Sequence, residues 1–296
     1  MWRGFLGSQN PIVIDTDAAN EIDDQFALSY ALLSQDRLSI EAIYAAPFVN
    51  ARSSSPAHGM RQSLREIETV LDRFGGSQVP VHPGSRAWMA GPRSPIESSA
   101  ASNLIERARA HTETAPLTVL ALAAATNVAS AILAAPDILP KMVVVWLGGH
   151  PVDWHRTDEF NLRQDVHAAR VLFDSGVDLI HIPCQHVAQL LMTTRHEVDA
   201  MVRSRGPLGD YLADIFAGSE QSHFGRSRSL WDLAPVAAVV CPDALDLVAA
   251  HSPILTDELT WSQDAGRHLI RQARTVSRDA IFADFFRRLE DHASAA

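Results

Sequence analysis

The chain has 296 residues, of which 47% are hydrophobic, so it can form a sizeable core and is not a disordered protein. Its formal charge of −10 and its isoelectric point near 5.7 argue against binding to nucleic acid or to an anionic membrane. The first ten residues lack the apolar core of a signal peptide and no apolar run could span a bilayer, so we expect a cytoplasmic protein.

Strands and helices are predicted to alternate along the chain. Strands are expected at residues 12–14, 39–46, 79–84, 117–123, 142–147 and 179–182, and helices at 22–33, 60–74, 100–110, 127–133 and 167–173. The later part is expected to contain two helices within 197–217, one at 232–240, short strands from 245 onward and a final helix at 279–291. This alternation predicts an α/β fold with an open, mostly parallel, Rossmann-like sheet and helices on both faces, in a single domain over residues 1–296.

The most informative segment is 11–28, where acidic residues follow directly on the first predicted strand. Asp15 and Asp17 come at the strand end, Glu21 follows in the loop, and Asp23 and Asp24 open a helix. Like charges this close repel each other unless a cation lies between them, and carboxylate ligands favour calcium or magnesium over zinc. The alternative is a turn followed by solvated acids that the helix dipole favours. Open α/β sheets bind ligands at this end of their strands, which favours the metal site.

The same segment resembles the N-terminal signature of the nucleoside hydrolases, including the inosine-uridine-preferring type. That signature is Asp-x-Asp, a short loop, and Asp-Asp at a helix start. Here the loop, residues 18–22, is longer than the three residues usual in the family. The resemblance implies the nucleoside hydrolase fold.

Later segments resemble the same family in chain order. Residues 123–129 resemble its Gly-Pro-Leu-Thr-Asn-Ile-Ala turn, and 143–149 resemble the strand before its Met-Gly-Gly. Residues 159–169 resemble its Glu-Phe-Asn-x-x-x-Asp-x-x-Ala-Ala element, within which Asp165 is expected to cap the next helix. Residues 231–237 resemble its His-Asp-x-x-Ala-Val-Ala element. The match therefore runs through nearly the whole chain.

The resemblance implies a calcium ion and a set of residues around it. The implied calcium ligands are Asp17, Asp24, Asp232 and the backbone carbonyl of Thr126. The implied contacts to the ribose hydroxyls are Asp23, Asn50, Glu159 and Asn161, and Asp153 aligns with a sugar-contacting asparagine of some members. Asp17, beside both metal and water, is the candidate general base.

Trp231 departs from the family pattern. Many members carry there a histidine that protonates the leaving base, and an indole N–H cannot do so at neutral pH. His155 and His150, which follow the Gly-Gly strand end, are the candidates for a replacement donor, and Trp231 is a candidate surface for stacking the base. The two cysteines, Cys184 and Cys241, lie in apolar runs and are expected to be buried thiols.

Taken together, these residues predict calcium-dependent hydrolysis of the N-glycosidic bond of ribonucleosides to free base and ribose. A calcium-dependent ribose- or nucleoside-binding protein without turnover is the alternative on the same fold. A magnesium-dependent phosphotransferase is a further alternative, but no phosphate-cradling Gly-rich loop is evident. The expected partner is a small nucleoside, and family members are commonly dimers or tetramers, so a homo-oligomer is expected.

Overall fold

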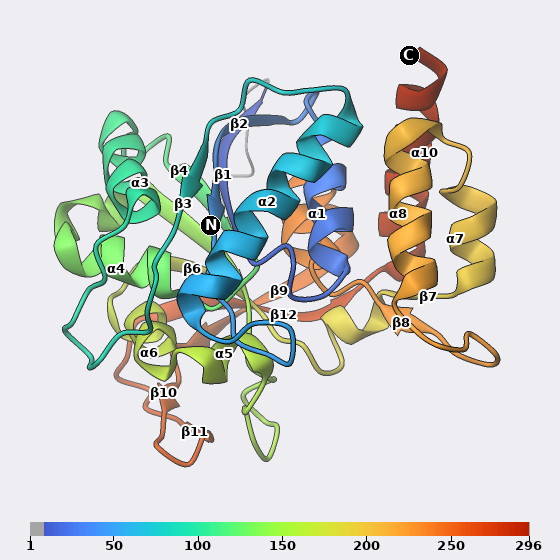
Figure 1. The fold of residues 1–296 in the computed structure, drawn as a ribbon. Coiled ribbons are helices and arrows are strands. Elements are labelled where there is room, and N and C mark those ends of the chain that lie inside the picture. Colours follow the sequence, from blue (N-terminus) through green and yellow to red (C-terminus); the bar gives the residue numbers. More distant parts are fainter. Residues whose placement is uncertain (1–8, 296) are drawn as a thin grey trace.

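The computed structural model describes residues 9–295, in which a central eight-stranded sheet organises the chain (Figure 1). The first eight residues, which include most of the segment considered as a signal peptide, lie outside that range. The strand order is β3-β2-β1-β4-β5-β6-β12-β9. The strands are β1 (Asn10–Thr16), β2 (Leu38–Ala45), β3 (Val81–Pro83), β4 (Leu117–Ala121), β5 (Met142–Leu147), β6 (Asp178–Ile182), β9 (Leu245–His251) and β12 (Leu269–Val276). Only the β12–β9 pair is antiparallel within this sheet, so the predicted open, mostly parallel sheet is confirmed.

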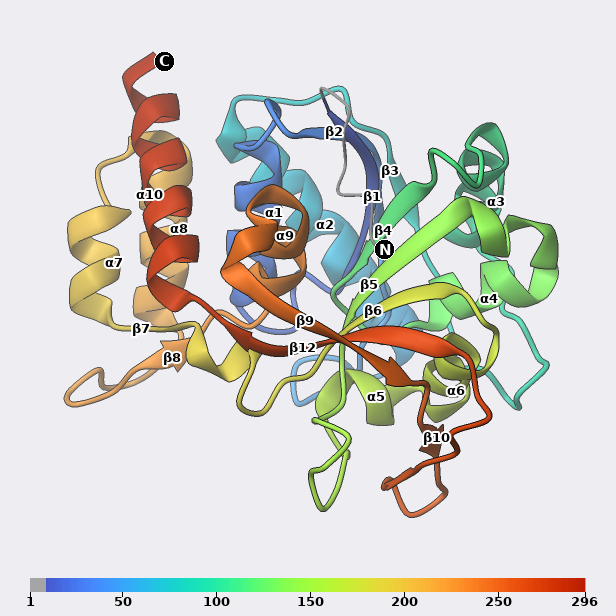
Figure 2. The same ribbon diagram turned by 180° about the vertical axis from the view of Figure 1, so that it is seen from behind.

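Helices cover both faces of the sheet (Figures 1 and 2). One face packs against α1 (Asp23–Leu32), α2 (Pro56–Phe74), α7 (Arg195–Met201), α8 (Gly206–Gly218), α9 (Leu233–Val240) and α10 (Arg278–Ala295). The other packs against α3 (Ser99–Ala110), α4 (Thr126–Ala134), α5 (Phe160–Gln164) and α6 (Val166–Asp174). Strand β1 shows why two cores form: Ile12 and Ile14 point into the first and Val13 into the second, as strand alternation requires. Such a strand, buried on both faces, is uniformly apolar.

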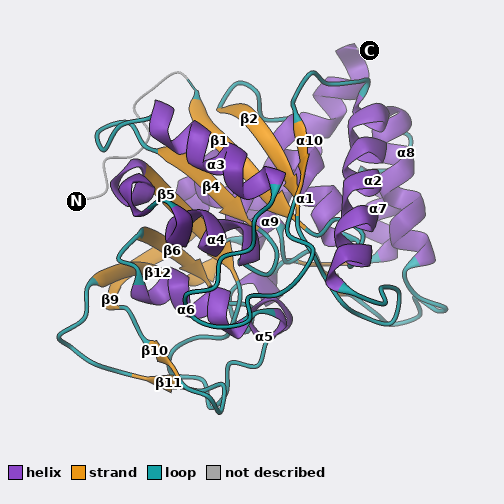
Figure 3. Ribbon diagram, turned by 60° about the vertical axis from the view of Figure 1, so that its left-hand side comes forward, coloured by secondary structure: helices purple, strands orange, loops and turns teal. Residues whose placement is uncertain are grey.

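Apart from the short strands expected from 245 onward, the short elements at the rim are those that hydrophobic periodicity did not predict. The five residues of α5 are too few for a helical pattern. Two small antiparallel pairs also lie outside the main sheet: β7 (Met192–Thr193) with β8 (Arg228–Ser229), labelled in Figure 1, and β10 (Ile254–Leu255) with β11 (Trp261–Ser262), seen in Figure 3. Short 3-10 helices occupy Pro136–Lys141, Ala188–Leu190 and Pro242–Ala244.

Helix α2 begins four residues before its predicted start. Its N-cap is Ser55, whose hydroxyl accepts a hydrogen bond from the His58 backbone N–H at 3.2 Å, and Pro56 occupies the first turn. Both features favour a helix start, because the cap satisfies a free N–H and proline is tolerated there. The apolar pattern alone therefore underestimates the length of this helix.

Parallel register brings several strand ends to one edge of the sheet. Asp15 of β1 pairs with Ala121 of β4, and Leu147 of β5 pairs with Ile182 of β6. The loops that follow these strands therefore meet, as in other open α/β sheets. Among residues 9–295, none of the helices has the length and apolar character needed to cross a membrane.

Candidate functional site

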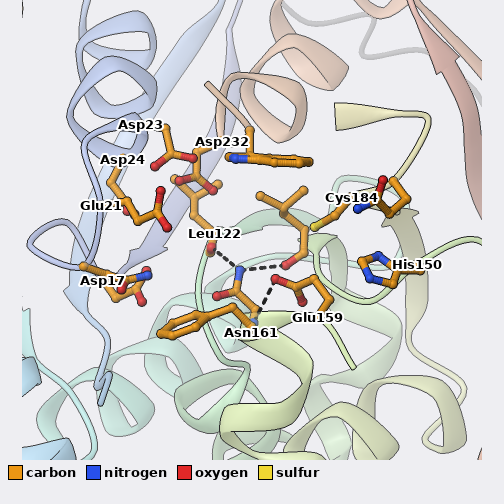
Figure 4. A pocket seen from close by; sticks show the side chains of 15 residues that line it. Asp17, Glu21, Asp23, Asp24, Leu122, His150, Glu159, Asn161, Cys184 and Asp232 are labelled. Carbon is orange, nitrogen blue, oxygen red and sulfur yellow. Dashed lines mark hydrogen bonds between the residues drawn. The ribbon is translucent and has the colours of Figure 1, made fainter. Parts of the chain in front are cut away.

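A cavity of about 260 Å³ lies where the loops after β1, β4, β5 and β6 meet the start of α9 (Figure 4). The residues that line it are Asp17, Asn20, Glu21, Asp23, Asp24, Leu122, Leu147, His150, Glu159, Phe160, Asn161, Cys184, Gln185, Trp231 and Asp232. Figure 4 shows Asp17, Glu21, Asp23 and Asp24 along one side of the cavity, with Cys184 and His150 on the opposite side. The cavity thus has an acidic wall, and Glu159 lies closer to its other side, near His150.

The acidic wall is built by the starts of two helices and the end of β1. Asp23 and Asp24 begin α1, and Asp232 immediately precedes α9. Carboxylate oxygens of these three buried residues all lie within 4.8 Å of one another. Asp17 lies in the loop after β1 and is also buried. We refer to Asp17, Asp23, Asp24 and Asp232 as the acidic cluster.

The acidic cluster is electrostatically suited to bind a cation. Burial raises the pKa of all four carboxyl groups, and repulsion from neighbouring carboxylates raises it further, so that the pKa of Asp23 reaches about 7. One oxygen each of Asp17 and Asp232 is buried without a hydrogen-bond partner within the described chain. No lysine or arginine is found among the described residues that line the cavity. Because buried charges need compensation and all the donors are oxygens, the acidic cluster could hold a hard divalent metal ion.

Asp15 lies behind the acidic cluster and does not line the cavity. Its Oδ1 accepts a hydrogen bond from Asn127 Nδ2 at 2.7 Å. Asn127 Oδ1 in turn accepts hydrogen bonds from the backbone N–H and hydroxyl of Ser85, at 2.7 and 2.8 Å. Burial raises the pKa of Asp15 to about 7, against the effect of the Asn127 hydrogen bond. These contacts fix the end of β1 below the site.

Glu159 is held in the cavity by backbone N–H groups. It caps α5, where Oε1 accepts from the Asn161 N–H at 2.9 Å and Oε2 from the Leu162 N–H at 3.1 Å. Oε2 also accepts from the Gly149 N–H at 2.8 Å. Burial raises the pKa of Glu159, and these three hydrogen bonds oppose the shift. The carboxylate is therefore fixed in position before any ligand arrives.

Asn161 joins the ends of two strands. Its Nδ2 donates to the Leu122 carbonyl at 2.7 Å and to the Leu147 carbonyl at 3.1 Å, as the dashed lines of Figure 4 show. Both amide protons are thus used, so Asn161 can meet a ligand only through Oδ1, as an acceptor.

The Gly148–Gly149 turn supports Glu159 and is itself supported from below. Gly149 has a φ of +67°, and a Cβ there would lie 2.7 Å from Thr157 Oγ1, so the position favours glycine. Beneath the turn, fully buried His181 donates from Nε2 to the Gly148 carbonyl at 2.7 Å. Its Nδ1 accepts from Gln272 Nε2 at 3.2 Å, so the neutral imidazole is completely partnered.

On the side away from the acidic cluster, the lining includes the imidazole of His150 and the thiol of Cys184 as well as the Glu159 carboxylate. Desolvation lowers the pKa of half-buried His150, whose Nδ1 has no partner among the described residues. Burial, and then the nearby Glu159 carboxylate, raise the pKa of the Cys184 thiol well above its usual range. Trp231 lies beside them on the lining.

Thr126, the predicted carbonyl ligand, does not reach the cavity. It starts α4, one helical turn beyond the strand end, and its hydroxyl donates to Asp165 Oδ2 at 2.8 Å. The residue from this segment that lines the cavity is Leu122, directly after β4. Asp165 caps α6 by accepting from the Ala168 N–H at 3.0 Å, which confirms its predicted helix-capping role.

Three other predicted residues also lie outside the lining. Asn50 donates to Asn20 Oδ1 at 2.9 Å and so supports the loop after β1 from behind. Asp153 and His155 are exposed in the segment after Gly149, and His155 packs against Trp154 with ring centroids 5.3 Å apart. His150 is therefore the only predicted proton donor that the structure brings to the cavity. The predicted residues that it does bring together are Asp17, Asp23, Asp24, His150, Glu159, Asn161, Trp231 and Asp232.

Sequence reasoning missed several lining residues. Leu122 lines the cavity directly after β4, and nothing in its residue type marks it as part of a site. Cys184 and Gln185 follow β6, and the rule that ligands bind after the carboxyl ends of parallel strands could have identified them.

Comparison with known proteins agrees with this arrangement. The family model described as "Inosine-uridine preferring nucleoside hydrolase" matches residues 12–283. A protein of Arabidopsis thaliana named "Probable uridine nucleosidase 2" is 25% identical over 86% of this chain and 85% of its own length. The pyrimidine-specific ribonucleoside hydrolase RihA of Klebsiella pneumoniae is 28% identical over 69% of this chain and 70% of its own.

Solved structures share the fold at lower identity. A purine-preferring ribonucleoside hydrolase from Gardnerella vaginalis aligns with a TM-score of 0.74 and 20% identity, covering 97% of this chain and 100% of that one. An inosine-guanosine nucleoside hydrolase aligns with a TM-score of 0.76 and 17% identity, covering 97% and 99%. At these identities the likeness concerns the fold.

Proposed function

The chain belongs to the inosine-uridine preferring nucleoside hydrolase family, and we propose that it uses calcium to hydrolyse the N-glycosidic bond of ribonucleosides to free base and ribose. Family membership makes it a ribonucleoside hydrolase; the metal and the residue roles are the proposal. The acidic cluster is the main support for the metal ion, because four buried carboxylates line the cavity without a lysine or arginine on the described lining. Such a cluster is stable in its ionised form only with a cation.

We assign Asp17, Asp24, Asp232 and the Leu122 carbonyl to the ion, with Leu122 in place of Thr126. The unpartnered oxygens of Asp17 and Asp232 support their assignment. Asp23 and Asp24 each share a hydrogen bond with Asp232, and Asp24 is assigned to the ion because the family resemblance implies it. When bound, the ion would bind and polarise the attacking water. Calcium takes six to eight oxygen ligands, so solvent or substrate oxygens would complete its shell.

The remaining roles follow from what each side chain can still accept or donate. Asp17 accepts the proton of the attacking water, since it lies on the acidic wall with one oxygen free. Asp23, Glu159 and Asn161 accept hydrogen bonds from the ribose hydroxyls, Asn161 through Oδ1. The carboxylates around the sugar also stabilise the positive charge that develops on it as the bond breaks. The base would then lie against Trp231.

Release of reducing sugar and free base from a panel of nucleosides, with calcium and with chelator, tests the proposal. We expect release that depends on the metal. Calcium-dependent binding of nucleoside without release would support the binding-protein alternative, and phosphate release from phosphoesters would support a phosphotransferase.

We also propose that the chain forms one domain. The two hydrophobic cores lie on opposite faces of the same sheet, and adjacent residues of β1 contribute to both. Neither core could be separated from the other without dividing that strand. Limited proteolysis should accordingly yield no stable fragment that retains half of the sheet.

A further inference from the structure

Resting on the proposed hydrolase function, we infer that the cavity is built for ribosides whose base carries a positive charge, such as N-ribosylpyridinium and N7-alkylpurine ribosides. The inference starts from what the cavity lacks. A neutral base leaves as an anion unless something protonates it. The lining of the cavity offers few groups that can protonate a leaving base. A cationic base leaves as a neutral molecule and needs no proton.

The potential donors are few. The lining residues with a proton on nitrogen or sulfur outside the amides are Trp231, His150 and Cys184. An indole N–H is not acidic at neutral pH, so Trp231 can only donate a hydrogen bond. The position thus presents an aromatic face where a proton donor would be expected.

His150 is a poor acid in this setting. It is half-buried, and desolvation outweighs the nearby Asp158 carboxylate, so the pKa of its imidazole is lowered; His155 lowers it further. The ring is therefore neutral at pH 7 and has no spare proton. Burial keeps the Cys184 thiol protonated, but its hydrogen bond to Glu159 directs it toward the carboxylate.

The charge of the cavity favours a cation as well. Six carboxylates line it: Asp17, Glu21, Asp23, Asp24, Glu159 and Asp232. Glu21 forms an ion pair with Arg228, whose charge also acts on Asp23, which leaves four without a protein countercharge. A divalent ion offsets two of these charges, so the cavity remains negative. Trp231 adds a ring face of the kind that attracts cations.

The reaction balances without an acid. The bond between C1′ and the cationic ring nitrogen breaks, and its electron pair returns to that nitrogen, which becomes neutral. The water oxygen forms the new bond to C1′, and its proton passes to Asp17. The products are ribose and a neutral base. Positive charge moves from the base to the sugar during the reaction, toward the carboxylates that surround it.

Kinetics on five substrates tests the inference. The panel is nicotinamide riboside and 7-methylguanosine as cationic ribosides, uridine and inosine as neutral ones, and 4-nitrophenyl riboside as a neutral riboside with a good leaving group. We expect kcat/KM, after division by the uncatalysed rate, to be at least about 10²-fold higher for a cationic riboside than for uridine and inosine, because general acid help is worth roughly that much. A preference for only one of the two cationic ribosides would show which size of base the cavity accepts, and it would still support the inference.

The outcomes separate the inference from the function on which it rests. Equal normalised rates for neutral and cationic ribosides would overturn the inference and leave nucleoside hydrolysis intact. No hydrolysis of any of the five substrates with calcium present would overturn the proposed function itself.

Trp231→His, with Trp231→Phe as its matched control, tests whether residue 231 determines the preference for cationic ribosides. The histidine supplies a titratable donor, so the ratio of cationic to neutral kcat/KM should fall by about tenfold or more. The phenylalanine keeps a ring face without a titratable proton, so the preference for cations should persist. An unchanged ratio in a folded Trp231→His protein would contradict the inference.

Binding to the unmodified protein gives a readout that requires no turnover. Two uncleavable C-ribosides differ only in charge, one bearing N-methylpyridinium and the other the neutral methylphenyl ring. Calorimetry with calcium present should show that the cation binds about tenfold more tightly, which corresponds to about 1.4 kcal/mol. Equal affinities would refute recognition of the charge.

Discussion

The two ends of helix α1 carry carboxylates in opposite situations. At its N-terminal end, Asp23 and Asp24 crowd against Asp232 with no positive side chain on the described cavity lining. Beyond its C-terminal end, Asp36 and Asp284 both contact Arg288, whose Nε lies 2.8 Å from Asp284. Tyr30, on the same helix, donates to Asp284 at 2.7 Å.

This difference distinguishes carboxylates that form a binding site from carboxylates that stabilise the fold. The hydrogen bond from Arg288 lowers the pKa of Asp36, whereas burial raises the pKa of Asp24. Groups whose charge is compensated inside the protein stabilise the fold, and groups left without compensation need a ligand from outside. One helix thus links an internally balanced network to a cluster that could bind a cation.

Removal of a carboxylate from the acidic cluster should have the largest effect. Asp24→Ala and Asp232→Ala should each abolish calcium binding and hydrolysis, because the site loses both charge and a ligand. Asp284→Ala, from the balanced network, is the matched control and should bind calcium like the unmodified protein. Calorimetry decides: unaltered calcium affinity in both cluster variants would refute the metal assignment.

Asp17→Asn sharpens the comparison within the acidic cluster. The amide keeps the shape and one coordinating oxygen but cannot accept the proton of water. Turnover at saturating calcium should fall by roughly 10²–10⁴, while nucleoside binding persists through Asp23, Glu159 and Asn161. Asp36→Asn provides the control at the other end of α1.

Single-turnover kinetics and equilibrium binding measure the two properties of Asp17→Asn separately. Near-normal turnover would exclude Asp17 as the base and direct attention to Asp23.

His181 extends the comparison to a buried base that is fully partnered. Burial lowers its pKa to about 4, from an ordinary value near 6.5, so the folded protein binds this proton less readily than the unfolded chain. Its contribution to stability is complete above about pH 6.5 and is lost as pH falls toward 4, by an amount on the order of 3 kcal/mol. Urea unfolding across this range should show a shallower acid loss in His181→Gln, and identical pH profiles would contradict the assignment.

The smallest effect is expected in the balanced network. Arg288→Met removes Arg288 from both Asp36 and Asp284. Asp36 keeps Arg37 at 3.6 Å, and both carboxylates remain partly exposed, so water can solvate them. The free energy of unfolding should fall by about 1–2 kcal/mol, with calcium affinity unchanged. Denaturant titration and calorimetry measure the two quantities. A loss of calcium affinity would show that the two ends of α1 are not independent.

The order of strands and helices, and the acidic turn, could be predicted from the sequence because both are local. Apolar residues with a strand or helix period identify the elements, and Asp17, Asp23 and Asp24 are close in the chain before they are close in space. Asp232 and the 159–161 segment were found only by resemblance, since nothing local connects them to the first turn. The short helix α5 was not predicted, because five residues are too few to show a helical period.

By itself, then, the sequence determined the α/β class, the end of the sheet that bears the site, and the hard-cation character of its ligands. Only the tertiary structure decided which later residues meet there. It places Leu122 on the cavity lining and Thr126 outside it, because residues 122–125 separate the end of β4 from the start of α4. It brings in His150 and leaves His155 outside, because Gly149 turns the chain sharply and the following segment runs to the surface. Backbone carbonyls and loop directions depend on packing between distant segments, and no pattern of residue types along the chain encodes them.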